Sequence, residues 1–268
     1  MKINELYQFL LDVYARRRFI INLAKNDVKS RYAGSFFGIF WAFMQPLVTI
    51  LVFWFVFQVG FKKSPVINIE FILWFVAAYI PWIYFSDGVI SSANCFFEYS
   101  YLVKKMKFRT SILPIVKVLS ATLIHLFFII FVLLMYFIYG YKFEIIWLQT
   151  IYYSFCTFCL IIGISWIVSS ISVFFKDFAQ IVNIALQIGF WLTPIFWSPD
   201  SISESVLTVL KFNPMYYVVQ GYRDCFITGI YFWQRGTINF YFWGVVCIVF
   251  VLGTVTFKRL RPHFADMI

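Results

Sequence analysis

Polar and helix-breaking residues lie inside the most apolar stretches of this 268-residue sequence. They are Gln45-Pro46, Pro81, Gln187 and Thr193-Pro194. A proline inside a helix leaves a carbonyl group of the preceding turn without its hydrogen bond, and a neighbour or water must satisfy it. Polar groups deep in a membrane tend to face the helix bundle or a wet path. The pattern favours a polar path, and the alternative is hydrogen bonding that only packs helices together.

Catalytic motifs are missing from the sequence. It contains no GxxxxGK[ST] phosphate loop, no DxD pair, no HExxH and no GxSxG. His125 and His263 lie in separate segments, and a lone histidine in a helix is typical of packing. Cys156 and Cys159 form a CxxC without polar partners, which is typical of small buried residues on one helix face. The sequence therefore predicts no catalytic residue and no metal site.

The composition is that of an integral membrane protein. Hydrophobic residues make up 62% and charged residues 13% of the chain, and the mean hydropathy is +0.84. Five stretches lack Asp, Glu, Lys and Arg, a sixth contains only Asp87, and each reaches the about 20 residues that a spanning helix needs. We predict an all-α fold with six spans, at about 37–60, 71–94, 114–140, 146–174, 179–198 and 237–258.

The basic residues predict the orientation. Fifteen Lys and Arg residues lie on the side of the termini, six lie on the other side, and Lys117 lies at a membrane edge. Basic residues collect in short cytoplasmic loops, so both termini are predicted to be cytoplasmic. Membrane orientation and anionic lipid also explain the net charge of +10, without a nucleic-acid partner.

Three segments outside the spans have a helical pattern. In 1–36, Ile20, Ala24, Val28 and Tyr32 recur at four-residue steps beside basic residues, which predicts an amphipathic helix at the inner membrane surface. The stretch 98–112 mixes basic and apolar residues; it is either a solvated loop or a short helix that contacts a partner protein. The membrane domain then covers 37–261, and 259–268 forms a cytoplasmic tail.

The segment 199–236 is less polar than an ordinary loop. Ser201 and Glu204 form a capping box before 206–210. Asn213 is predicted as an N-cap with Pro214 at the first helical position, opening a helix over 215–226. Neither helix is long enough to cross a membrane. We therefore predict a re-entrant pair that packs on protein or lines a wet cavity.

Aromatic residues make up 24% of the chain. Their flat apolar faces suit the C–H faces of sugars, although most of these residues are expected to face lipid. Five are candidates for a path lining, because they lie beside the polar positions in the first and fifth spans. They are Trp41, Phe43, Phe190, Trp191 and Phe196.

A series of motifs in this order resembles the ABC-2 type permeases that export polysaccharides, such as O-antigen and teichoic-acid exporters. The motifs are Asp27 to Tyr32 (DVKSRY) with Gly34-Ser35, Gly38, Trp41 and Pro46; Pro81-Trp82 with Phe85; Leu102 to Lys105 leading to Pro114; Phe174 to Asp177; Trp191 to Ile195; Asn213-Pro214 with Arg223; and Arg259 to Asp266. The likeness covers nearly the whole chain. One departure is Lys107-Phe108-Arg109, where many relatives have Phe-Pro after the lysine.

The resemblance implies a homodimer in the bacterial cytoplasmic membrane that works with two copies of a separate ATPase. The complex would move a lipid-linked glycan outward, in contact with membrane lipids. It implies no cofactor on this chain, with ATP and Mg on the ATPase.

The resemblance also implies roles for residues. The substrate path would be lined by Trp41, Phe43, Gln45, Pro46, Gln187, Phe190, Trp191, Thr193, Pro194 and Phe196. Coupling to the ATPase would use Leu102, Lys104, Lys105, Met106, Lys107 and Phe108 of a coupling helix at 98–112, with Lys176 and Asp177. The interface helix and its hinge would comprise Lys29, Arg31, Tyr32, Gly34 and Gly38, and the outer gate Asn213, Pro214 and Arg223.

Arg223 has two interpretations from the sequence: it binds a lipid phosphate, or it reaches outward to the headgroups. Three other classes of function also stand beside the polysaccharide exporter. An exporter of a drug or small lipid needs a narrower path, and a membrane-embedded transferase needs clustered His, Asp or Glu. A structural subunit needs no polar residues at depth.

Overall fold

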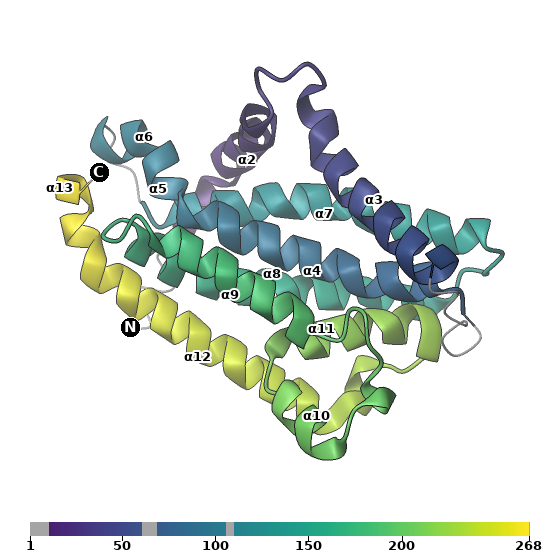
Figure 1. Ribbon diagram of the computed structural model, residues 1–268. Coiled ribbons are helices and arrows are strands. Elements are labelled where there is room, and N and C mark those ends of the chain that lie inside the picture. The colour runs from purple at the N-terminus through teal and green to yellow at the C-terminus, as the bar shows by residue number, and fades with distance from the viewer. Residues whose placement is uncertain (1–10, 61–68, 106–109, 268) are drawn as a thin grey trace.

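The computed structural model describes residues 11–60, 69–105 and 110–267, and its elements within these ranges are helices (Figure 1). They are α2 (Arg17–Arg31), α3 (Trp41–Trp54), α4 (Phe71–Ala93), α5 (Cys95–Glu98), α6 (Ser100–Lys105), α7 (Ile112–Ile138), α8 (Gln149–Ser172), α9 (Phe178–Leu192), α10 (Glu204–Leu210), α11 (Pro214–Arg223), α12 (Gly236–Leu260) and α13 (Phe264–Met267). The all-α prediction is confirmed for this part of the chain.

Five helical stretches of the described residues are long and apolar enough to cross a membrane. They are Gly38–Gly60, Phe71–Ala93, Ile112–Ile138, Ile145–Ser172 and Phe232–His263. The first combines a 3-10 turn at Gly38–Phe40, α3 and a π-helical turn at Phe55–Gly60. These stretches match the first four predicted spans and the last one closely.

The helix of the predicted span at 179–198 is shorter than predicted. Its helix, α9, has 15 residues and ends at Leu192. At about 1.5 Å per residue it is roughly 22 Å long, against about 30 Å of bilayer hydrocarbon. The helix ends because Pro194 disfavours the helical conformation of the residue before it. Thr193 is accordingly extended, with φ −86° and ψ 140°.

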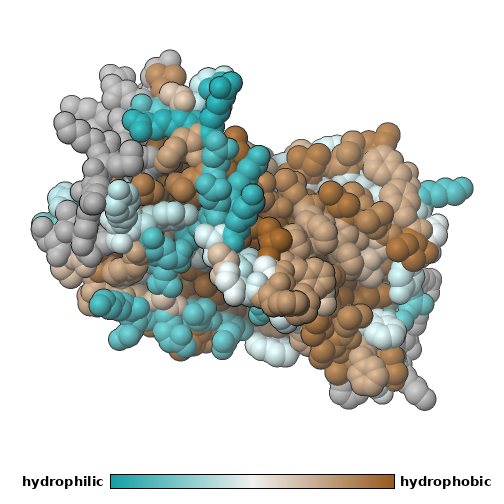
Figure 2. All heavy atoms as spheres, turned by 90° about the horizontal axis from the view of Figure 1, so that it is seen from above, coloured by the Kyte–Doolittle hydropathy of each residue, from teal (hydrophilic) through white to brown (hydrophobic). Residues whose placement is uncertain are grey.

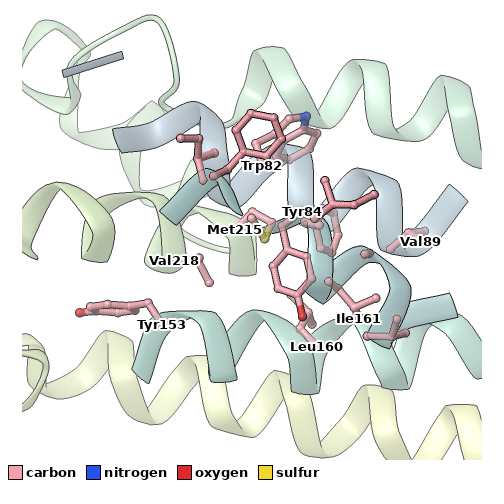
Figure 3. Close-up of a cluster of buried hydrophobic side chains, with 14 of the residues drawn as sticks. Trp82, Tyr84, Val89, Tyr153, Leu160, Ile161, Met215 and Val218 are labelled. Atoms are coloured by element: carbon pink, nitrogen blue, oxygen red, sulfur yellow. The ribbon is translucent and has the colours of Figure 1, made fainter. Parts of the chain in front are cut away.

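Helix α4 lies at the centre of the bundle, with α7, α8, α9 and α11 packed around it (Figure 1). Seventeen of its 23 residues are buried, so it is apolar on most of its surface, as expected of a helix largely surrounded by protein. Figure 3 shows the packing on one side, where Trp82 and Tyr84 of α4 lie near Ile161 of α8 and Met215 of α11. Helix α4 therefore positions the helices that pack around it.

Helices α8 and α12 approach closely at two glycines. A Cβ atom on Gly253 would lie 2.6 Å from the carbonyl oxygen of Gly163, and one on Gly163 would lie 2.9 Å from a Val249 side-chain carbon. Small residues allow such contact between helices in a membrane, where dispersion rather than the hydrophobic effect holds helices together.

Gly253→Ala is expected to lower the free energy of unfolding by about 1–3 kcal/mol, because the added methyl group overpacks this contact. The matched control is Gly244→Ala in the same helix, where an added Cβ would have no atom within 4 Å. Thermal unfolding of both purified variants in detergent measures the difference. Equal midpoints for the two variants would contradict the close packing at Gly253.

Helix α2 carries the predicted apolar stripe, with Ile20, Ala24 and Val28 buried. The stripe packs on protein, because α2 lies against α7 and Ser120 donates a hydrogen bond to the Ala24 carbonyl at 3.1 Å. The side chain of Asp27 is buried on the same face. The amphipathic helix is therefore tied to the third span.

In the segment 199–236, one of the two predicted caps is confirmed. The Asn213 side chain accepts a hydrogen bond from the Met215 amide at 3.0 Å, and α11 begins at Pro214. The predicted capping box at Ser201 is wrong. Pro199 starts a 3-10 turn in which Ser201 donates to the Ser198 carbonyl, so α10 begins only at Glu204, with Ser203 as its N-cap.

The stretch 98–112 is not one continuous helix. Helix α5 ends at Glu98. Tyr99 interrupts the helix with non-helical angles of φ −103° and ψ 26°, and α6 begins at the next residue. Residues 106–109 lie outside the described part of the chain, and α7 already begins at Ile112. At this end of the bundle, Phe96 of α5 and Phe174 after α8 both contact Phe264 of α13.

Candidate functional site

A cavity of about 720 Å³ lies between α3, α4, α7 and α9. Its walls combine aromatic and aliphatic side chains with amide, hydroxyl and carboxylate groups. The lining residues that carry these polar or aromatic groups include Gln45, Thr49, Tyr79, Trp82, Tyr84, Asp87, His125, Gln187 and Phe190. Walls of this kind can bind a polar ligand. Their aromatic rings contact C–H surfaces of the ligand, and their amides and hydroxyls exchange hydrogen bonds with it.

Four predicted path residues meet in this cavity. Gln45 and Pro46 come from α3, and Gln187 and Phe190 come from α9, more than 130 residues further along the chain. A second hollow of about 360 Å³ continues along α4 and α9, and Trp191 lines it. The polar positions of the first and fifth predicted spans therefore share one space.

The other predicted path residues lie elsewhere. Trp41 is exposed and packs edge-on against Phe37. Phe43 packs on Phe127 with ring centroids 4.2 Å apart, over a separate small hollow beside α2. Neither residue lines the main cavity.

The residues that follow α9 are buried and pack against neighbouring helices. Thr193 and Pro194 are buried, and Thr193 bonds both the Gly189 carbonyl and the Asn213 side chain. Phe196 contacts rings of three helices: its centroid lies 5.2 Å from Phe75, on which it stacks, 4.5 Å from Phe53 and 5.0 Å from Phe190. Phe196 and these three rings form an aromatic cluster beyond the end of α9, in contact with α3 and α4.

One face of α4 supplies the lining residues that sequence reasoning missed. Tyr79, Trp82, Ser86 and Ile90 recur at three- and four-residue steps and line the cavity together. That spacing places them on one stripe of a helix. The stripe was readable in the sequence, where Asp87 counted only as an interruption of the second span.

A charge network joins α2, the α5–α6 junction, α4 and α7. The Lys117 side chain, 1% exposed, donates to Asp27 at 2.5 Å and also to Glu98. The Tyr99 hydroxyl donates to the same Asp27 oxygen, Oδ1, at 2.7 Å. The predicted coupling segment is therefore bonded directly to α2 and α7.

Arg31 extends this network to the cavity. Its guanidinium donates to Asp27 at 3.1 Å and to both oxygens of Asp87 at 3.1 and 3.2 Å, and Asp87 lines the cavity wall. Burial alone would raise the pKa of Asp27, but Arg31 and Lys117 outweigh it and hold the pKa below its ordinary value. Asp27 is thus an ionised, buried junction between Lys117 and Arg31.

The predicted hinge lies between α2 and α3. Gly34 and Gly38 adopt positive φ angles of 91° and 52°, which favour glycine. An added Cβ at either position would have no described atom within 4 Å, so these glycines serve backbone conformation and not close packing. Lys29 is exposed and Tyr32 lines the cavity.

The predicted coupling residues are described only in part. Lys104 and Lys105 belong to α6, while Met106, Lys107 and Phe108 lie outside the described residues. Leu102 is half-buried against the core, and Lys176 and Asp177 are exposed in the turn between α8 and α9. In Figure 1 this turn lies at the same end of the bundle as α5 and α6.

The surface differs in hydropathy between α2 and α3. Figure 2 shows hydrophilic residues gathered over the part of the molecule that contains α2, and a largely hydrophobic surface over α3. Exposed apolar side chains on α3 include Val48, Leu51 and Val52. The exposed face of α3 is suited to lipid or to another protein within the membrane.

A bundle of apolar helices around a mixed aromatic and polar cavity defines a membrane transport protein, with a charge network at its basic end. The chain belongs to the ABC-2 type transporter family, whose pattern it matches over residues 18–227. Together with its five apolar helices of spanning length, this makes it a multi-pass protein of the bacterial inner membrane.

Curated relatives match nearly the whole chain. It is 26% identical to an O-antigen export system permease protein RfbA of Klebsiella pneumoniae, over 93% of this chain and 94% of that protein. It is also 26% identical to an O-antigen export system permease protein RfbA of Myxococcus xanthus, over 84% of this chain and 83% of that protein.

Proposed function

We propose that this chain is the permease subunit of an ATP-driven exporter that moves a lipid-linked polysaccharide outward across the cytoplasmic membrane. The observation that carries the proposal is the cavity shared by α3, α4, α7 and α9, with its aromatic and amide walls. The relatives named as O-antigen export system permeases support a polysaccharide as substrate. The cavity and these relatives favour this function over drug export and over a transferase.

The chain forms the path as a homodimer. Gln45 and Gln187 are exposed in the single chain although both belong to apolar helices. An amide facing lipid is unfavourable, because nothing in the hydrocarbon can bond to it. A second copy against α3 and α9 covers these amides and encloses the cavity.

The proposal includes a membrane topology. The chain crosses six times, with α9 and the extended residues after it forming the fifth crossing. Both termini and α2 lie on the cytoplasmic side, and α10 and α11 enter the outer leaflet as a re-entrant pair. The excess of basic residues on the side of the termini supports this orientation.

A separate ATPase supplies the energy by docking at the α5–α6 segment and the α8–α9 turn. Closure of two ATPase copies moves α5 and α6, and the bonds of Lys117 to Glu98 and Asp27 pass that movement to α2 and α7. Arg31 bonds Asp87 in the cavity wall, so the same movement reaches the path. This physical chain of contacts is the basis for coupling hydrolysis to opening.

Deleting the gene from its host is expected to remove the polysaccharide from the cell surface, while its lipid-linked form accumulates on the cytoplasmic leaflet. Reintroducing the wild-type gene restores surface display. Immunodetection on intact and on permeabilised cells separates the two pools. A normal amount of surface polysaccharide in the deletion strain, with altered drug tolerance, would support the small-molecule exporter instead.

A further inference from the structure

Arg223 is a buried cation whose donors are only partly used. Its side chain is 3% exposed, its guanidinium lies 3.5 Å from the centre of the Trp74 ring, and one nitrogen donates to the Ile195 carbonyl at 3.1 Å. The other two nitrogens, Nε and Nη1, are buried and have no hydrogen-bond partner among the described residues. A buried, charged donor without a partner is costly, which points to a missing ligand.

The arginine side chain is enclosed by protein. Burial lowers its pKa to about 9, so the surroundings disfavour the charged form as they stand. The guanidinium therefore does not extend freely into solvent, as a side chain that reaches outward would. The stacking on Trp74 instead holds the guanidinium inside the protein.

Arg223 lines a cavity of about 320 Å³ formed by α4, α10, α11, α12 and the loops between them. Gln220 and Lys211 line the same cavity, and the Nε2 of Gln220 is likewise buried without a partner. The Lys211 side chain makes no hydrogen bond or ion pair with the described residues. The exposed residues Asp200 and Thr228 belong to its lining, so the cavity opens at the surface.

The lining of this cavity has a net positive charge when Arg235, which is paired with Asp224, is left out of the count. Arg235 also lines it, but its guanidinium is occupied by Asp224, with oxygens at 2.5 and 2.7 Å. Asp200 is the one carboxylate in the lining, and it accepts from Ser198 at 3.1 Å. Arg223 and Lys211 thus leave an excess of one positive charge, and the unused groups are N–H donors.

We propose that this cavity is a binding site for a phosphate group, with Arg223 at its base and Lys211 and Gln220 as further donors. A phosphate offers three or four oxygens to donors that come from different directions, more than the two oxygens of a carboxylate. The phosphate belongs either to a lipid headgroup or to a free phosphate ion. The site is separate from the transport cavity, and its occupancy does not depend on which substrate is exported.

Binding is tested on the purified full-length protein in a neutral detergent, with inorganic phosphate as the probe and chloride at equal ionic strength as the reference. Phosphate is expected to raise the unfolding midpoint of the wild type, because a ligand that binds only the folded state stabilises it. Arg223→Met is expected to weaken the apparent phosphate affinity by roughly tenfold or more, since charge-assisted bonds are lost. Lys142→Met, which removes an exposed cation outside the cavity, is the matched control.

A second arm distinguishes the lipid source. The protein is reconstituted in nanodiscs of phosphatidylcholine with or without phosphatidylglycerol, and native mass spectrometry counts the lipids that remain bound. Retention of phosphatidylglycerol by the wild type and by Lys142→Met, but not by Arg223→Met, assigns a lipid headgroup. A response to inorganic phosphate alone assigns the free ion, and the absence of both responses in the wild type overturns the proposal.

Two further variants keep the test decisive if Arg223→Met does not fold. Lys211→Met leaves the buried arginine in place and is expected to weaken phosphate binding, because Lys211 is the second unpaired cation. Asp200→Asn is expected to tighten binding by removing the negative charge from the lining. Loss of phosphate binding in Asp200→Asn would contradict the assignment, and neither measurement depends on transport or on the ATPase.

Discussion

Lys117→Met is expected to lower the free energy of unfolding by about 3–5 kcal/mol and to abolish export. Asp27, 2% exposed, would lose its closest charged partner and would remain ionised in a buried site. Removing one partner from a buried charge cluster is costly because Asp27 would keep only Arg31 as a charged partner, and its Oδ1 would lose the bond from Lys117. Unfolding of the purified protein in detergent and surface display of the polysaccharide measure the two effects.

The double variant Asp27→Asn with Lys117→Met separates stability from coupling. It removes both buried charges, so most of the lost stability is expected to return. Export is expected to stay low, because the α5–α6 junction is then no longer bonded to α2 and α7 through Lys117. Full export by the double variant would show that the network serves stability alone.

Lys142→Met is the control for loss of a lysine. Lys142 is exposed between α7 and α8, and its replacement is expected to change the free energy of unfolding by at most about 0.5 kcal/mol. Wild-type stability of Lys117→Met itself would contradict the burial of the network.

Thr49→Trp is expected to reduce export by more than about tenfold without unfolding the protein. Thr49 lines the main cavity from α3 and is only partly buried, so a large ring at this position extends into the cavity instead of into the packed core. Its hydroxyl donates to the Gln45 carbonyl one turn earlier and also contacts the Tyr79 hydroxyl, and the loss of one such bond costs about 1 kcal/mol. The effect on export therefore comes from the obstructed path.

Thr49→Val is the matched control, because it removes the same hydroxyl without filling the cavity. Both variants are expected to reach similar amounts in the membrane and similar unfolding midpoints. Surface polysaccharide is measured in a deletion strain carrying each variant. Normal surface display with Thr49→Trp would mean that the cavity between α3 and α9 is not the path.

Local patterns in the sequence predict several elements of the fold well. The apolar stretches predicted α4, α7, α8 and α12, and Asn213-Pro214 predicted the start of α11. The length of α9 was also open to prediction, because Pro194 disfavours helix at Thr193. The apolar character of 193–198 concealed that signal, since these residues are buried by the aromatic cluster around Phe196 and not by a helix.

The candidate site was predicted only in part, because local sequence patterns identify unusual residues but not the neighbours that they meet in the fold. Glutamine and proline in an apolar helix are unusual whatever surrounds them, so Gln45, Pro46 and Gln187 were recognised one by one. The aromatic residues Trp41 and Phe43 were assigned to the path by their neighbours in sequence, but the turn of α3 directs them elsewhere. The stripe on α4 was missed because its polar members, Ser86 and Asp87, stand in an otherwise apolar stretch.

By itself the sequence determined what depends on neighbours within a few turns: the membrane class, most of the long helices and the cap at Asn213. Only the tertiary structure decided which distant groups meet. Lys117 reads as a membrane-edge lysine, yet it bonds Asp27, 90 residues earlier, and Glu98, 19 residues earlier. The physical reason is that hydrophobic periodicity and capping act along the chain, whereas the partner of a buried charge depends on how helices pack around it.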